Sequence, residues 1–205
     1  MPGDGCRYVY EASLNHMAES SDVDLIPRTA AEIARRTLAL IAIVDHAHNE
    51  NPEALKDWVT SNSIADEFSD AEREFFDNAN PTTQDITTFS WRAEAMVPLL
   101  WSVWRLPELS PLNVQIDWSQ IDDLNEILTR PGEFVSSAEL RPIEEINEAE
   151  AFLYHQHWRV RDAQLFQKPM PEELDPGIVF ERRYAASWIV GWGRAAGWDN
   201  VPTDT

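Results

Sequence analysis

The sequence predicts an all-α protein, a single compact bundle of about seven helices that follows an irregular N-terminal extension. Apolar residues recur every three or four positions along most of the chain, which is the period of an amphipathic helix. No stretch alternates apolar and polar residues over enough positions to build a sheet. Nine Trp, eight Phe and four Tyr predict an aromatic, tryptophan-rich core, and a chain of 205 residues buries about 70% of its unfolded surface.

The first 26 residues show no sustained period, so we expect an extension over 1–26 and one helical domain over 27–205. The first helix is predicted over 29–48, and its centre is apolar on every face, which places it inside the bundle. A second helix should begin at Pro52, because proline favours the first helical position. Ser69 and Glu72 have the spacing of a capping box and predict the start of a third helix.

A fourth helix is expected over 83–104, with one apolar stripe and a kink at Pro98. Proline has no N–H to donate, so the carbonyl of Glu94 would be left free. The second half of the chain predicts further helices, a turn, a C-terminal cap and an extended tail. The helices are expected over 119–128, from Leu140 or Pro142 to Phe166, and over 177–196. A turn is expected at Pro131-Gly132, a C-terminal cap at Gly197, and an extended tail over 198–205.

The net charge of −20 is unevenly distributed along the chain. Residues 45–85 carry −9 and residues 117–150 carry −8, whereas residues 86–116 are neutral and residues 151–205 carry −1. A nucleic-acid-binding protein would show a basic patch, so nucleic acid is not an expected partner. The two acidic blocks fit either a solvated surface or a docking face for a basic protein partner.

Cellular location is predicted from cysteine usage and from hydropathy. Cys6 is the single cysteine, so no internal disulfide forms. The N-terminus lacks the basic and apolar regions of a secretory signal, and the longest apolar run, 38–44, is far shorter than the ~20 residues that span a bilayer. We therefore expect a cytoplasmic protein with no membrane partner.

Standard catalytic and cofactor motifs do not occur in the sequence, so no cofactor is expected. A metal site is not expected either. His46 and His48 point to different helix faces, and Phe152 and Tyr154 stand where a di-metal bundle would need glutamate before His155 and His157.

Charged residues do, however, interrupt the apolar faces of three predicted helices. His157 lies on an apolar stripe, and Glu181 shares a face with apolar residues. The candidate polar cluster comprises Arg92, Glu94, His157, Arg161, Asp162, Glu181, Arg182 and Arg183. Two interpretations are open: a buried network that fixes helix register, or a pocket in which carboxylate, imidazole and arginine bind a small anionic ligand.

Several segments in this order resemble one known family, that of domain of unknown function 4272. They are Arg35-Arg-Thr-Leu38, Trp91-Arg-Ala-Glu-Ala95 with Leu99-Leu-Trp101, Leu140-Arg-Pro142, His157-Trp-Arg-Val-Arg-Asp-Ala163, Asp175-Pro-Gly-Ile-Val179, Glu181-Arg-Arg183 with Trp188, and Trp198-Asp-Asn-Val-Pro-Thr-Asp-Thr205. The resemblance runs from about Pro27 to the C-terminus. It implies a compact helical domain and no assigned activity, while Pro98 and Gly191-Trp-Gly193 look like local departures from the family pattern.

Two functions are consistent with these observations. The first is a non-catalytic protein that acts by binding another protein, with a basic partner on its acidic surface. The alternative is a small-molecule-binding protein or hydrolase-like enzyme, in which His157 is acid or base and Glu94 or Glu181 is its carboxylate partner. An ordered N-terminal extension would also favour a homodimer.

Overall fold

The computed structural model describes residues 25–48, 51–195 and 197–203, and the expected N-terminal extension lies almost wholly outside them. The predicted all-α fold is confirmed, and no strand occurs in the described ranges. The helices are α2 (Ala30–His48), α3 (Pro52–Ser61), α4 (Asp70–Asp77), α5 (Thr83–Ser90), α6 (Arg92–Ser102), α7 (Leu124–Thr129), α8 (Pro131–Ser137), α9 (Ile143–Leu165) and α10 (Pro176–Val190), with short 3-10 helices η1 (Ile64–Glu67), η2 (Trp118–Gln120) and η3 (Trp198–Asn200).

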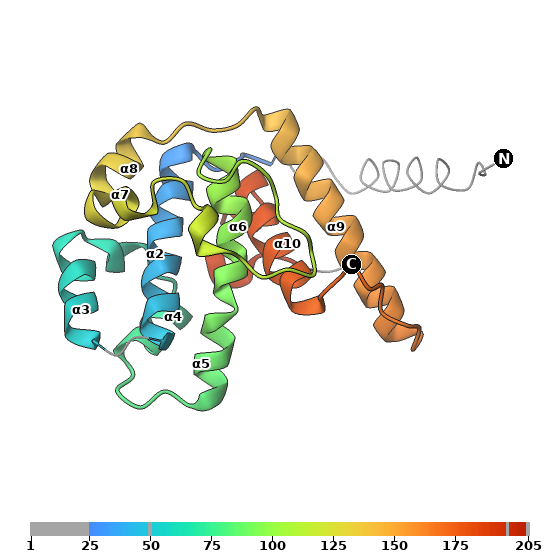
Figure 1. Ribbon diagram of the computed structural model, residues 1–205, viewed down its shortest axis with the longest axis horizontal. Helices are drawn as coiled ribbons and strands as arrows, with labels where there is room; N and C mark the ends of the chain where they lie inside the picture. The colour runs from blue at the N-terminus through green and yellow to red at the C-terminus, as the bar shows by residue number, and fades with distance from the viewer. Residues whose placement is uncertain (1–24, 49–50, 196, 204–205) are drawn as a thin grey trace.

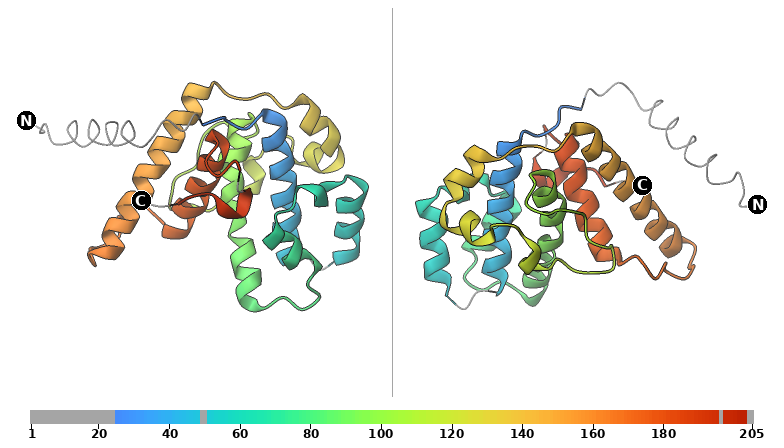
Figure 2. Two further views of the ribbon diagram at one scale, coloured as in Figure 1. Left: turned by 180° about the vertical axis from the view of Figure 1, so that it is seen from behind. Right: turned by 45° about the horizontal axis from the view of Figure 1, so that its top comes forward.

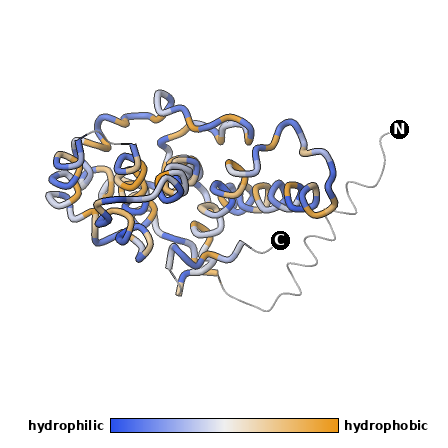
Figure 3. Tube along the Cα trace, turned by 90° about the horizontal axis from the view of Figure 1, so that it is seen from below, coloured by the Kyte–Doolittle hydropathy of each residue, from blue (hydrophilic) through white to orange (hydrophobic). Residues whose placement is uncertain are grey.

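The central helices form a row in which α2 packs against α6, α6 against α10, and α10 against α9 (Figure 1). In the three views, α9 and α3 lie at opposite edges of the molecule, and α7 and α8 lie together beside α2 (Figures 1 and 2). Hydrophobic and hydrophilic residues are interspersed along most helices (Figure 3). The row explains why α2 and α10 are apolar nearly all round, because each has neighbours on more than one side.

Burial confirms the predicted interior position of the first helix. All residues from Leu38 to Val44 in α2 are buried, and so are those from Glu181 to Val190 in α10. The capping box of Ser69 and Glu72 forms as predicted at the start of α4. A second capping box, of Thr82 and Asp85, begins α5.

The helix expected over 83–104 is divided into α5 and α6 at Trp91. The break is a tight turn in which the Glu94 N–H donates to the Trp91 carbonyl at 3.0 Å, three residues back. Helix α6 continues through Pro98, so the interruption lies about two turns before the proline. The Trp91 ring lies against Gly177, where an added Cβ would be only 2.8 Å away, so tertiary packing accompanies the break.

Two shorter segments also differ from expectation. The helix expected over 119–128 is η2 followed by α7, because Asp123 adopts a left-handed φ of 57° between them. Pro131-Gly132 begins α8 and is not a turn between helices. Proline at the first helical position lacks only an N–H that would be unpaired anyway, so the same dipeptide fits a helix start.

The last helix ends at Val190, six residues earlier than predicted, and its cap is Gly191 and not Gly197. Gly191 has φ 108°, and a Cβ there would lie 2.5 Å from the Ile26 carbonyl oxygen, because the chain before α2 crosses this point. The tail expected to be extended folds back onto the bundle, where it forms η3 and buries Trp198 and Val201.

The tryptophans lie mostly at the edge of the core. Only Trp188 and Trp198 of the nine are buried, and Trp104, Trp118 and Trp158 are exposed. The largest fully buried side chains are mainly aliphatic, such as Leu40, Leu99 and Ile189. An indole is large and carries an N–H that needs a partner, so it favours the boundary of a core over its centre.

Candidate functional site

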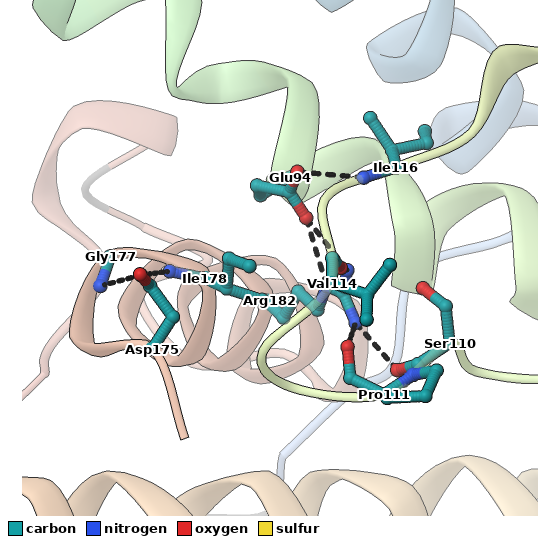
Figure 4. Close-up of polar contacts among 9 residues, drawn as sticks. All are labelled: Glu94, Ser110, Pro111, Val114, Ile116, Asp175, Gly177, Ile178 and Arg182. Carbon is teal, nitrogen blue, oxygen red and sulfur yellow. Dashed lines mark hydrogen bonds and ion pairs between the residues drawn. The ribbon is translucent and has the colours of Figure 1, made fainter. Parts of the chain in front are cut away.

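The predicted polar cluster begins with a buried ion pair between α6 and α10. The Glu94 carboxylate accepts from Arg182 Nε at 3.1 Å and from Arg182 Nη2 at 2.7 Å (Figure 4). Its other oxygen accepts the Ile116 backbone N–H at 2.9 Å. Arg182 is fully buried and Glu94 is 2% exposed. Both oxygens of this carboxylate are therefore engaged inside the protein.

The Arg182 guanidinium also binds the segment that connects α6 to α7. Its remaining N–H groups donate to the carbonyls of Ser110 at 2.6 Å, Pro111 at 3.1 Å and Val114 at 2.8 Å. Figure 4 shows this segment wrapped around the guanidinium. An arginine side chain has five N–H donors, and these contacts together with Glu94 occupy all five. Arg182 has no donor left for a ligand.

A second ion pair joins the same two helices. Arg92 donates to Glu181 at 2.9 Å, and its guanidinium lies over the Tyr184 ring at 5.1 Å. Burial raises the pKa of the Glu181 carboxyl, and the positive charge of Arg92 opposes this shift. The repulsion from Glu94 adds to the increase, which places Arg92, Glu94, Glu181 and Arg182 in one electrostatic group.

The remaining buried members lie on the opposite side of α10, against α9. Burial lowers the pKa of His157 to about 4, with a further decrease from the charges of Arg183 and Arg161. The His157 ring packs edge-on against Phe180, and its Nδ1 is buried without a hydrogen-bond partner. Arg183 donates to the Pro202 carbonyl at 2.6 Å. His157 is therefore a neutral imidazole at pH 7, in an apolar contact.

Two residues of the predicted polar cluster belong neither to the group between α6 and α10 nor to the group between α9 and α10. Arg161 is exposed, and Asp162 forms an ion pair with Lys168 at 2.8 Å near the end of α9. The sequence places Arg161 one turn after His157, but each helical turn advances slightly around the axis. That advance carries the side chain away from α10 and into solvent. The predicted single cluster is thus a group between α6 and α10, a group between α9 and α10, and two surface residues.

Sequence reasoning did not identify one large cavity in the described residues. It has a volume of about 1050 Å³ and lies between the C-terminal part of α2, helix α3, the α5–α6 junction, and the segment that leads into α7. Indole rings contribute from three of these elements: Trp58 from α3, Trp91 from the junction, and Trp118 from η2. We call it the tryptophan cleft. Of the predicted cluster, only Glu94 lines it.

The walls of the tryptophan cleft are mainly apolar. Ile41, Leu55, Ile86, Leu124 and Leu128 contribute aliphatic surface, and the Trp58 indole N–H donates to the Leu128 carbonyl at 2.8 Å, which ties α3 to α7. Among the described residues, no Lys or Arg side chain lines the cleft, whereas the carboxylates of Asp45 and Glu94 do.

The sequence carried one signal for this site. Except for α6, the segments that form the walls of the cleft lie within or next to the acidic blocks 45–85 and 117–150. These acidic segments nevertheless include Trp58 and Trp118. An indole in a strongly acidic surface segment is typical of an interface more than of a core. What the sequence could not supply is the proximity of three segments that are distant along the chain.

The described residues were compared with the requirements of a metal site and of a membrane-spanning helix. No group of three or more His, Cys, Asp or Glu residues in the described ranges could hold a metal ion. Within the same ranges, each helix is too short or too polar to cross a membrane.

Comparison with known proteins identifies the family. Neither a search of curated proteins nor a search of solved structures gives a match. The family model described as domain of unknown function (DUF4272) matches residues 5–201. This match includes every segment on which the resemblance was based, except the last residues of the tail, and it reaches further toward the N-terminus than the resemblance did. The chain belongs to the DUF4272 family.

Proposed function

We propose that this protein is a non-catalytic binding protein whose tryptophan cleft accepts an apolar segment of a basic partner protein. The observation that carries the proposal is a mainly apolar, tryptophan-walled cleft of about 1050 Å³ bordered by acidic segments. A volume of about 300–1000 Å³ is typical of small-molecule sites, so this cleft is at the upper limit and has room for several side chains of a peptide.

Charge supports a basic partner. Helix α3 belongs to the acidic block 45–85, in which α5 begins, and another part of the wall, from Asp117 to Leu128, belongs to the second acidic block. Exposed carboxylates stand on these walls next to lining residues, including Glu53, Asp57, Asp117 and Asp123. Helix-in-groove recognition uses apolar anchors inside and complementary charges at the rim. A partner with apolar anchors and flanking Lys or Arg residues fits both features.

The internal contacts of the polar cluster favour a structural role over catalysis. Arg182 and Glu94 are saturated by each other and by the backbone of residues 110–116, so they hold the segment that carries Gln115, Ile116 and Trp118 to the cleft wall. An anionic ligand would need a guanidinium with free donors, and Arg182 has none. A cytoplasmic location stays part of the proposal, on the ground of the single cysteine.

The test measures binding of a labelled amphipathic peptide of Leu and Lys by fluorescence anisotropy, with a matched Leu and Glu peptide as control. We expect the Leu/Lys peptide to bind, and its affinity to decrease as the ionic strength is raised, because salt screens rim charges. Ala54→Trp fills the cleft from an exposed position on α3 and should weaken binding at least about tenfold, or about 1.4 kcal/mol.

Ala71→Trp is the matched control, because Ala71 is exposed on α4 in the same acidic block but does not line the cleft. It should bind as the wild type does. Equal affinity for the two peptides, or equal affinity of the wild type and Ala54→Trp, would contradict the proposal. Binding of the neutral dye Nile red that Ala54→Trp abolishes, without peptide binding, would instead identify a small apolar ligand.

A further inference from the structure

The second residue of helix α10 is a glycine that lies against an indole ring. Pro176 and Gly177 begin the helix, and Gly177 is half-buried. A Cβ added to Gly177 would be 2.8 Å from Cζ3 of Trp91 and 3.0 Å from its Cη2. Gly177 has no positive φ, so the backbone conformation does not require glycine at this position. The contact with the Trp91 ring does require it.

Helix α8 begins with the same dipeptide and provides a direct comparison. Pro131 and Gly132 occupy its first two positions, as Pro176 and Gly177 do in α10. Nothing lies within 4 Å of a Cβ added to Gly132. The local sequence and the helical position are the same in both helices, so the difference between the two glycines comes from the indole packed on Gly177.

The first turn of α10 is fixed by hydrogen bonds. The N–H groups of Gly177 and Ile178 donate to Asp175 Oδ1 at 2.8 and 3.0 Å (Figure 4). The N–H of Asp175 itself donates to the Leu112 carbonyl at 2.8 Å, and Ile178 is buried. A side chain added at Gly177 would therefore displace the Trp91 ring more easily than it would displace the helix.

The Trp91 ring lies between the start of α10 and the tryptophan cleft. Trp91 lines the cleft, whereas Gly177 does not. The same indole packs against a cluster of buried apolar side chains that includes Leu112, Leu153 and Ile178. A ring displaced from α10 consequently takes up volume on the cleft side.

We propose that Gly177 is a positioning residue of the tryptophan cleft: it leaves room for the Trp91 ring against α10 and so keeps the cleft deep enough for an apolar anchor of the partner. This inference rests on the proposed function, because the anchor belongs to the same peptide. Gly177 acts through Trp91 and does not touch the occupant.

The first experiment is a double-mutant cycle, with affinity for the Leu/Lys peptide measured by fluorescence anisotropy. Gly177→Ala should weaken binding at least about threefold, whereas Gly132→Ala should bind as the wild type does. Phenylalanine has a smaller ring than tryptophan and leaves room for the added Cβ. Gly177→Ala should therefore have no further effect in a Trp91→Phe background.

The second experiment needs no partner. Fluorine NMR of protein labelled with fluorotryptophan gives a resonance for Trp91, which Trp91→Phe assigns by its loss. Gly177→Ala should shift this resonance in the free protein, and Gly132→Ala should leave it in place. If the wild type does not bind the peptide, the proposed function fails, and the Trp91 resonance still decides whether Gly177 positions the ring.

Three results would overturn the inference. One is a Trp91 resonance that Gly177→Ala does not move. Another is wild-type affinity of Gly177→Ala in a protein that binds the peptide. The third is an equal loss of affinity from Gly177→Ala with Trp91 or Phe at position 91, since the effect would then come from the helix. Circular dichroism checks folding, and Trp91→Phe should restore the fold if Gly177→Ala alone disrupts it; a lack of rescue would also overturn the inference.

Discussion

Buried arginine side chains in the described part of the chain are held in two ways. Four guanidinium groups lie over aromatic rings, at 3.7 to 5.2 Å from the ring centroid: Arg28 on Trp188, Arg36 on Trp198, Arg141 on Trp101 and Trp104, and Arg183 on Tyr154. Arg182 instead binds one carboxylate and three backbone carbonyls. A guanidinium is planar and weakly hydrated, so it can stack and donate at the same time. These residues tie elements together.

His157 makes the stability of the protein dependent on pH. Its pKa is about 4 in the folded state, chiefly because of burial, and near 6.5 in an unfolded chain. Between these values the unfolded state binds more protons, so stability is full above about pH 6.5 and is lost as the pH falls toward 4. His157→Leu should remove the part of this dependence that His157 contributes, which is at most about 1.4 kcal/mol per pH unit in that window. Urea unfolding at pH 7 and pH 5 measures it.

The matched control for this prediction is His155→Leu, an exposed histidine on the same helix. It should retain the wild-type difference between pH 7 and pH 5. The pKa of Glu150, raised by burial, changes stability in the opposite direction, but it is present in all three proteins. A His157→Leu variant as sensitive to acid as the wild type would show that His157 is protonated in the fold.

At the scale of elements, α10 determines how the polar residues are grouped. It lies between α6 and α9, and consecutive residues of a helix point about 100° apart. Glu181 and Arg182 consequently face α6, whereas Arg183 contacts Tyr154 and lies near His157 on α9. A run of three charged residues in the sequence thus serves two different interfaces.

The end of α10 provides a test of backbone geometry. Gly191→Ala should destabilise the protein by more than about 1 kcal/mol, because φ is 108° and the new Cβ would meet the Ile26 carbonyl oxygen at 2.5 Å. Gly132→Ala is the control within α8, where no atom lies within 4 Å of the added Cβ. It should stabilise by about 0.5–1 kcal/mol. Chemical denaturation of both variants gives the comparison, and equal effects would exclude the strained cap.

At the scale of the whole molecule, the C-terminal tail closes the bundle. The Trp198 ring packs on Trp188 and under Arg36, and its carbonyl accepts the Tyr184 hydroxyl. The next residue, Asp199, accepts the Ala71 N–H of α4 at 3.1 Å. The tail therefore connects α2, α4 and α10, which are distant along the chain.

Loss of these contacts should unfold the protein at lower denaturant concentration. Trp198→Ala removes a buried indole and should cost about 3–5 kcal/mol. Trp118→Ala removes an exposed indole and should cost less than about 0.5 kcal/mol. The midpoint of urea unfolding separates the two variants, and similar midpoints would mean that the tail contributes nothing to the fold.

Several features of the fold follow from local patterns in the sequence. The all-apolar centre of α2, the capping box at Ser69, the stripe that carries His157, and the charges of Glu94 and Arg182 among apolar neighbours were all predicted. The capping box forms, and the centre of α2, His157, Glu94 and Arg182 are buried. Helical periodicity and capping depend on residues within one or two turns, so a single sequence contains them.

Which of these residues contact each other depends on long-range packing. Glu94 and Arg182 bind the backbone of residues 110–116, the tryptophan cleft joins segments far apart in sequence, and Arg161 turns outward although its neighbour Val160 is buried. The break at Trp91 and the early end of α10 at Gly191 likewise accompany contacts with Gly177 and Ile26. Local patterns fix which face of a helix is apolar, whereas long-range packing fixes which neighbour that face meets.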